Sequence, residues 1–365
     1  GFVLGRPVIV PVKTGATESW KAIFGNGYNS ESGKAVLFVV DLSGSFSASS
    51  IRMIEAEASG APGGKNGLGN IVVVDRSGAL GAVRDGYADV VYAADQKGSI
   101  WKFDLHDASN TKLTVPLFTS NAFVEAGVTQ RQPIIGGVTA ATGPGGGVML
   151  YFGTGSFSFV GDATDTTQQS LYAVNDTSSG AVTSTVTRAQ LVARSVNASA
   201  DGARTLSAPS VVTGARGWYV DLPAGERFVG NPRIASGVVF MPTYSPQVGS
   251  GGCSTTGRNA LFGLNARTGA AALSNVRQGS PNGTTPAPGT ASLQLNTPGT
   301  APVKDVGVTV LPRVGPAVPD PTLPPGTPPG TPPAPPAQGC WMTVTAAGLV
   351  DPCLLYTSPS PRDRG

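Results

Sequence analysis

Two carboxylates flank a glycine in the stretch RDGYAD, residues 84–89, and this spacing could bind Ca²⁺. Calcium loops of the DxDxDGxxD type bring side-chain oxygens from alternate positions to one ion, with glycine at position six and a backbone carbonyl at position seven. With Asp85 at position five, Gly86 falls at position six, the carbonyl of Tyr87 at position seven and Asp89 at position nine. The second half of a calcium loop is therefore present.

The first half of such a loop is incomplete in this sequence. Positions one and three fall on Gly81 and Val83, which supply no side-chain oxygen, so Asp75 would have to complete the ligand set after an insertion. The alternative is a β-meander in which Asp85 and Gly86 form a hairpin turn. The residues alone leave a Ca²⁺ site and a simple turn both open.

Other familiar chemistries lack the residues they need. The single histidine, His106, excludes a zinc site with two histidines, and a Ser-His-Asp triad would depend on that one residue. His106 follows a predicted strand in FDLHDAS, so we expect an exposed loop side chain. The stretch GPGGG at residues 143–147 lacks the GK[ST] ending of a phosphate loop and is predicted to be a hairpin tip.

The cysteines must be considered together with the end of the chain. Residues 353–363, CLLYTSPSPRD, match the translation of a string similar to a common transposase-type sequencing adapter, so we interpret residues 353–365 as an artefact and exclude them from fold reasoning. This leaves Cys253 and Cys340. They are candidates for one disulfide in an oxidising compartment, and two unrelated thiols are the alternative.

The composition predicts an all-β protein. Among 365 residues there are 50 glycines and 31 prolines, and only 13% of residues are charged, which suits short strands joined by tight turns. The net charge is +3 and the basic residues are scattered, which argues against nucleic acid or a membrane surface as partner. No segment has the roughly 18 uninterrupted apolar residues of a membrane span. The chain opens without methionine, so we expect that a signal peptide or an upstream domain is missing.

One hairpin pattern recurs along the chain. A strand of alternating apolar and small residues is followed by a glycine turn and then by a second strand that ends in an acidic or amide residue, at residues 22–42, 90–105, 149–176 and 259–269. The stretches DLSG, NDTSSG and NARTG are predicted as exit turns. Repeated hairpins of this kind are typical of β-propeller blades. A β-sandwich with long loops is the alternative, but a sandwich has no reason to repeat the inner-strand motif.

Long polar insertions separate the repeated units, at residues 43–69, 107–131 and 177–207. Loops of this length are often functional, so binding could be located there without a readable motif. The stretch 312–339 is rich in proline, which favours polyproline II and predicts a semi-rigid tether. The predicted organisation is a propeller domain, a Pro-rich linker, a short C-terminal segment and the artefact, at residues 1–311, 312–339, 340–352 and 353–365.

Several ordered motifs resemble one protein family. They are GRPVIVPV, WKAIFGNGYNSESGKAVLFVVDL, YADVVYAADQKGSIWKFDL, RQPI, MLYFGTGSF, GWYVDLPAGERFVGNPRIASGVVFMPTYSP and NALFGLNARTG. The match runs from about Gly1 to Gly269. In this order they resemble the C-terminal β-propeller of the PilY1/PilC family of type IV pilus biogenesis and adhesion proteins of Gram-negative bacteria. The resemblance implies a modified β-propeller, related in fold to quinoprotein dehydrogenases, with long inter-blade loops, and a von Willebrand A-like region upstream.

The resemblance also implies a site, partners and a location. Many members carry a calcium loop immediately before the motif that corresponds to YAADQKGSIWKFDL, so the expected Ca²⁺ ligands are Asp75, Asp85, Asp89 and the carbonyl of Tyr87. Expected partners are minor pilins, the pilus tip and a host or abiotic surface ligand. The expected location is the cell surface or pilus tip, where the protein would promote pilus assembly, attachment and twitching motility.

Three functions are compared on this basis. The leading prediction is a non-enzymatic pilus biogenesis factor and tip adhesin, with Ca²⁺ as its only expected cofactor. The alternative is a PQQ-type quinoprotein dehydrogenase, which would be expected to have a cofactor-sandwiching tryptophan and adjacent cysteines. No Cys-Cys pair is present, and blade packing is expected to explain Trp20, Trp101 and Trp218. A third hypothesis is a purely structural propeller that docks minor pilins without ion or receptor.

Overall fold

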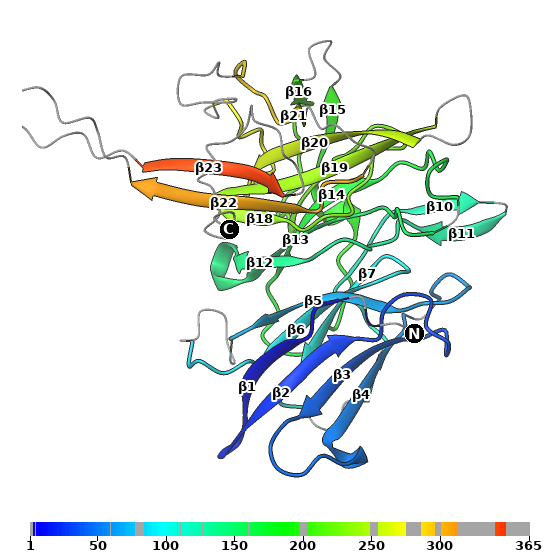
Figure 1. Cartoon of the computed structure of the whole chain (residues 1–365), viewed down its shortest axis with the longest axis vertical. Helices are drawn as coiled ribbons and strands as arrows, with labels where there is room; N and C mark the ends of the chain where they lie inside the picture. The colour runs from blue at the N-terminus through cyan, green and yellow to red at the C-terminus, as the bar shows by residue number, and fades with distance from the viewer. Residues whose placement is uncertain are drawn as a thin grey trace, which may run out of the picture.

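The computed structural model describes residues 3, 5–58, 60–76, 84–107, 109, 111–125, 127–159, 161–197, 203–248, 255–274, 286–295, 301–312 and 340–347, with side chains described for all of these except 248, 255–256, 309–312 and 340–347. Nearly all regular structure in these residues is β-strand (Figure 1). The only helical segments among them are single 3₁₀ turns, η1 (Ala48–Ser50), η2 (Pro144–Gly146) and η3 (Arg188–Gln190). The predicted all-β class is confirmed.

The first sheet contains the N-terminal strands, in the order β1-β2-β3-β4-β8. Its strands are β1 (Val8–Thr14), β2 (Thr17–Gly25), β3 (Ala35–Asp41), β4 (Ile51–Ala56) and β8 (Lys112–Leu113). The first four form an antiparallel meander, and β8 adds in parallel to β4. The meander is drawn in blue at the lower end of the molecule in Figure 1.

The second sheet has the order β5-β6-β7-β9. Its strands are β5 (Leu68–Val74), β6 (Val90–Asp95), β7 (Ser99–Asp104) and β9 (Phe118–Thr119). A separate hairpin of β10 (Ala122–Glu125) and β11 (Val128–Arg131) projects at the side of the molecule in Figure 1. The central β6–β7 hairpin is the predicted YAAD and SIWKFD unit, with Val91 opposite Phe103.

The third sheet joins two four-stranded groups, in the order β12-β13-β14-β17 and β21-β20-β19-β18, through β15 and β16. The first group contains β12 (Thr139–Thr142), β13 (Val148–Gly153), β14 (Ser170–Asp176) and β17 (Gly217–Asp221). The second contains β18 (Arg233–Ala235), β19 (Val238–Val248), β20 (Thr255–Asn265) and β21 (Ser292–Leu295). The connecting strands are β15 (Val192–Asn197) and β16 (Ala203–Leu206).

A last hairpin pairs β22 (Asp305–Pro312) with β23 (Cys340–Ala347). Pro312 and Cys340 are register partners, so the two ends of the Pro-rich stretch lie side by side. Residues 313–339 and 348–365, which include the predicted linker and the artefact, lie outside the described residues. The Pro-rich stretch therefore connects two strands of one hairpin, whereas the sequence predicts a tether to a separate segment.

The sheets are stacked as layers that share apolar cores. Alternate residues of β6 face opposite ways: Val91 and Ala93 join a core with the first sheet, whereas Tyr92 and Ala94 join a core with β13 and β14. A third core lies between the β13–β14 group and the β19–β20 group. Strands buried on both faces read as continuous apolar runs, which explains the sequence VVYAAD.

The predicted exit turns use one repeated hydrogen bond. The Oδ1 atom of the acidic residue that ends a strand accepts the backbone N–H two residues later, at 2.8 Å between Asp41 and Ser43 and at 2.9 Å between Asp176 and Ser178. The Oδ1 of Asn265 accepts the N–H of Arg267 in the same way, at 3.0 Å. Such Asx turns end a strand and reverse the chain at little cost, because the side chain substitutes for a backbone acceptor.

The long insertions differ from the sequence-based expectation. They are predicted as polar loops, yet β4 lies within residues 43–69, β8 to β11 within residues 107–131, and β15 and β16 within residues 177–207. These strands are short or carry charged residues, as in IRMIEA of β4, where Arg52 and Glu55 interrupt the apolar pattern on opposite faces, so their alternation is masked.

Candidate functional site

The RDGYAD loop connects β5 to β6 and is closed by side-chain to backbone hydrogen bonds. Asp75 follows the last residue of β5, and its carboxylate accepts the N–H of Asp85 at 3.3 Å and the N–H of Gly86 at 2.9 Å. Gly86 has φ of 90°, a value that favours glycine. The structure therefore brings together Asp75 and Asp85, which are ten residues apart in the sequence.

The carboxylate of Asp85 also accepts a hydrogen bond from the backbone of the same loop. Its Oδ1 accepts the backbone N–H of Tyr87 at 3.0 Å, which forms an Asx turn. The ring of Tyr87 lies beside the β1–β2 hairpin, with the ammonium of Lys13 5.3 Å from its centroid. The carboxylates of Asp75 and Asp85 thus hold the backbone of the loop itself.

Asp89, the residue before β6, is buried with 2% exposure and has other partners. One oxygen accepts the backbone N–H of Arg76, and the other lies 2.7 Å from Nε2 of His106. Burial raises the pKa of Asp89 above its ordinary value, although the His106 and Arg76 hydrogen bonds oppose that shift. The sequence predicts an exposed loop side chain at position 106, and His106 is exposed; its imidazole in addition pairs with a predicted site residue, Asp89.

The four predicted Ca²⁺ ligands do not form an oxygen cage in this conformation. Calcium takes six to eight oxygen ligands, whereas the carboxylates of Asp75, Asp85 and Asp89 are directed at N–H donors. In the part of the chain that the structure describes, no group of three or more His, Cys, Asp or Glu residues is placed to hold a metal ion. Residues 77–83 of the loop lie outside that part. The described residues do not fit a calcium site, and calcium binding stays a prediction.

The predicted disulfide is not tested by the structure. Cys253 lies outside the described residues, and only the backbone of Cys340 is described, as the first residue of β23. A pairing of Cys253 with Cys340 therefore stays a prediction.

A buried polar cluster links the second and third sheets. Asp176, at the end of β14, has no exposed surface and accepts hydrogen bonds from the hydroxyl of Tyr92 at 2.6 Å and the ammonium of Lys102 at 2.9 Å. Lys102 also donates to the carbonyl of Ser178 at 2.9 Å. Burial alone would raise the pKa of Asp176, but Lys102, Ser178 and Tyr92 outweigh it and hold the pKa below its ordinary value.

A second buried carboxylate lies inside the second sheet. Asp95 is 1% exposed and accepts the N–H of Ser99 and the indole N–H of Trp101, both at 2.8 Å. Burial raises the pKa of Asp95 to about 6 in spite of these hydrogen bonds. Trp218 is also buried, and its indole N–H donates to the carbonyl of Ala266 at 3.1 Å. Blade packing thus accounts for Trp101 and Trp218, as the sequence predicts.

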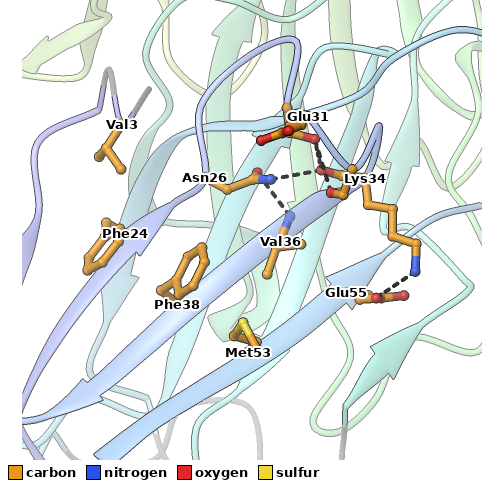
Figure 2. Close-up of a pocket in the computed structure, with 11 residues that line it drawn as sticks. Val3, Phe24, Asn26, Glu31, Lys34, Val36, Phe38, Met53 and Glu55 are labelled. Atoms are coloured by element: carbon orange, nitrogen blue, oxygen red, sulfur yellow. Dashed lines mark hydrogen bonds and ion pairs between the residues drawn. The ribbon is translucent and has the colours of Figure 1, made fainter. Parts of the chain in front are cut away.

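Trp20 does not follow this expectation. It is 56% exposed on the outer face of the first sheet, at one side of an apolar surface that includes a shallow groove. Figure 2 shows Phe24 and Phe38 side by side in this groove, and their rings stack at 5.3 Å between centroids. A salt bridge of 2.7 Å between Lys34 and Glu55 lies at the rim.

Sequence reasoning missed this surface although a signal was present. In β3 the residues that face each side of the sheet, 35, 37 and 39 on one side and 36, 38 and 40 on the other, are all apolar. A strand with one solvated face carries polar residues at every second position. The double apolar pattern therefore indicates a sheet made to be covered on both faces.

A family model described as the PilY1 beta-propeller domain matches residues 1–208, which is more than half of the 365 residues. The chain belongs to the PilY1 family. The predicted family resemblance is thereby confirmed.

Curated members of the PilY1 family match most of the chain. The type IV pilus biogenesis factor PilY1 homolog of Xylella fastidiosa strain Temecula1 is 35% identical over 334 residues, which cover 85% of this chain. The type IV pilus biogenesis factor PilY1 of Pseudomonas aeruginosa strain PAO1 is 27% identical over 317 residues, which cover 74% of this chain. The chain spans only 22% and 26% of the lengths of these two relatives.

The crystal structure of the Pseudomonas aeruginosa PilY1 C-terminal domain has the same fold. It matches with a TM-score of 0.61 at 22% sequence identity, over 86% of this chain and 70% of the crystallised chain. The predicted modified β-propeller is confirmed. Within the described residues, a search for helices that are long and apolar enough to cross a membrane finds none.

Proposed function

We propose that this chain is the propeller part of a type IV pilus biogenesis factor that promotes pilus assembly from the cell surface. The observation that carries the proposal is the 35% identity to the Xylella fastidiosa type IV pilus biogenesis factor over nearly the whole propeller. The layered sheets support it, because they form a rigid scaffold with loops free to contact partners. Minor pilins at the pilus tip are the proposed partners.

A chimera tests this proposal. The matching segment of the Xylella fastidiosa homolog is replaced by this chain, and the chimera is expressed in a strain that lacks its own copy. We expect surface pili, counted by electron microscopy, to return to the level given by the native gene. A chimera with Lys102→Met, which disrupts the buried ion pair with Asp176, is the matched control and is expected to restore fewer pili. A stable, exported chimera that restores no pili contradicts the proposal.

Adhesion and twitching motility are finer parts of the same proposal. They are supported by the resemblance to pilus tip-associated proteins and require their own measurements. We expect the chimera to restore both attachment to a surface and twitching zones. Restored pili without attachment would separate assembly from adhesion and favour a purely structural propeller.

Calcium regulation of this role stays a prediction. It would require Asp75 and Asp85 to exchange their backbone N–H partners for the ion. Calorimetric titration with Ca²⁺ alone, on the wild type beside Asp85→Ala, tests it: saturable heat that the substitution removes would show that the loop can rearrange into a site. The quinoprotein alternative is tested by an absorption titration with the quinone cofactor, where tight binding would contradict a purely non-enzymatic role.

A further inference from the structure

Lys97, Glu57 and Asn66 form a polar cluster at the start of the second sheet, in which one carboxylate holds both an amine and an amide. Lys97 lies in the turn between β6 and β7, and its Nζ donates to Oε1 of Glu57 at 2.8 Å. Asn66 lies just before β5, and its Nδ2 donates to Oε2 of the same carboxylate at 3.2 Å. Glu57 therefore brings the side chains of Lys97 and Asn66 together.

The strand register places the same two residues opposite each other. Leu68 and Asp95 are partners in the antiparallel β5–β6 pairing, so the register continued by two residues puts Asn66 opposite Lys97. A backbone hydrogen bond of 3.1 Å between the two intervening residues continues the ladder. Directly opposed residues of an antiparallel pair have Cβ atoms about 4.5 to 5.5 Å apart and share one face. The backbone thus holds the two side chains within reach of each other.

The amide of Asn66 is oriented for the loss of its nitrogen. Asn66 is 1% exposed, and its Nδ2 donates to the buried carboxyl of Asp95 at 3.3 Å as well as to Glu57. Its Oδ1 accepts the backbone N–H of Gly67 at 2.9 Å. A donor on a carbonyl oxygen stabilises the negative charge that develops there when a nucleophile attacks the carbon. The nitrogen that would leave faces two carboxyl groups, and the oxygen faces a donor.

The burial of the cluster favours neutral side chains. The side chain of Lys97 is 10% exposed and that of Glu57 is 33% exposed. Burial disfavours the charged forms of an amine and a carboxyl group alike, so it favours transfer of a proton from Nζ to Oε1 across their hydrogen bond. A neutral amine is a nucleophile, whereas an ammonium is not. Burial also raises the pKa of Asp95 to about 6, which places a second group that binds protons beside Nδ2.

We propose that Lys97 and Asn66 react with each other to form an intramolecular isopeptide bond, with Glu57 as the proton carrier. Nζ gives one proton to Glu57 and attacks Cγ of Asn66. The Nζ–Cγ bond forms and the Cγ–Nδ2 bond breaks, while Nδ2 takes a second proton from Nζ and leaves as ammonia. The ammonia then takes the first proton from Glu57 and departs as ammonium. The reaction needs no oxidant, cofactor or second protein, and the proposal does not rest on the pilus function.

The bond would tie the entry of β5 to the β6–β7 turn. Residues 66–97 would then form a covalent ring that includes β5 and β6. The β5–β6 pairing could not open at this end without breaking an amide bond, so the second sheet would resist unfolding and pulling from that side.

Intact mass spectrometry of the folded, reduced 365-residue protein tests the proposal. We expect a mass about 17 Da below that of the sequence, which is the loss of one ammonia. Trypsin cannot cut after an acylated lysine, so a digest is expected to contain residues 66–76 joined to residues 85–102. A folded protein with the full mass of its sequence and normal cleavage after Lys97 would overturn the proposal.

Three variants locate the reaction, and circular dichroism confirms that each is folded. Lys97→Arg keeps a cation for Glu57 but removes the amine, and Glu57→Gln removes the proton carrier, so both are expected to have the full mass. Lys34→Arg is the matched control: Lys34 pairs with Glu55 at 2.7 Å on the first sheet, and this variant is expected to keep the loss of about 17 Da.

A different reaction at the same asparagine is distinguished by these variants. Ring closure of Asn66 onto the nitrogen of Gly67 to a succinimide also releases one ammonia, but it does not involve Lys97. A loss of about 17 Da that persists in Lys97→Arg, without joined peptides, would identify the succinimide and overturn the proposal. Joined peptides that persist in Glu57→Gln would contradict the role of Glu57 as proton carrier.

Discussion

Asp95 makes the stability of this propeller depend on pH in an unusual direction. Its carboxylate is 1% exposed and is held by Ser99 and Trp101, and burial raises its pKa to about 6. The folded state therefore binds a proton at Asp95 more tightly than the unfolded state, in which an aspartate has a pKa of about 3.9. The stability from this group is fully present below pH of about 4 and is lost as pH rises through about 6.

The magnitude follows from the difference between the two pKa values. About two pKa units at about 1.4 kcal/mol each give about 3 kcal/mol of unfolding free energy lost between pH 4 and pH 7. Asp95→Asn removes this titration. Ser99 donates to Oδ1 of Asp95 and Trp101 donates to Oδ2, and the NH2 group of asparagine replaces one of these two acceptors, so the variant also has a constant cost of about 1 to 3 kcal/mol.

Urea unfolding followed by tryptophan fluorescence measures the effect. The free energy of unfolding of the wild type minus that of Asp95→Asn is expected to fall by about 3 kcal/mol between pH of about 4 and about 7. Asp176→Asn is the matched control: the pKa of Asp176 is held below its ordinary value, so its contribution is lost only as pH falls below about 4, and the difference is expected to stay nearly constant between pH of about 4 and about 7. A difference for Asp95→Asn that is the same at both pH values would refute the reasoning.

Three further substitutions test the buried contacts. Lys102→Met leaves the Asp176 carboxylate without its ammonium partner and should cost about 3 to 5 kcal/mol in urea unfolding at neutral pH; a cost near zero would contradict the ion pair. Phe152→Ala empties the core between the second and third sheets and should cost about 3 to 5 kcal/mol, unless the site collapses. Arg227→Lys loses the guanidinium that donates to the carbonyls of residues 156, 162 and 165, so proteolysis in that loop should accelerate. Phe152→Ala is the control, because it is expected to lower global stability without loosening this loop in particular.

The repeated hairpins could be predicted from the sequence because their information is local. Alternation and glycine turns specify a hairpin, and the Asx turns at Asp41 and Asp176 carry their own acceptors. Which sheet or strand end packs on each face of a hairpin is not local information. The exposure of Trp20 and the pairing of Asp89 with His106 depend on which sheet or strand end lies beside the residue, and a sequence pattern with period two does not encode this.

The candidate site shows the same limit. The acidic spacing in RDGYAD predicts a turn and a calcium loop equally well, because both use carboxylate oxygens as acceptors. The choice depends on where Asp75 points, and the structure directs it at the N–H groups of Asp85 and Gly86. Spacing alone could not foresee these hydrogen-bond partners of Asp75, and calcium binding stays a prediction.

The register of the last hairpin has a consequence for how this region tolerates change. Since Pro312 and Cys340 are partners, the 27 residues between them enter and leave the fold at one point. The entropy of closing such a loop grows only with the logarithm of its length, so each doubling costs about 0.6 kcal/mol. Insertions or deletions in this stretch should leave β22 and β23 paired, which makes it a place where length can drift in evolution without loss of the propeller.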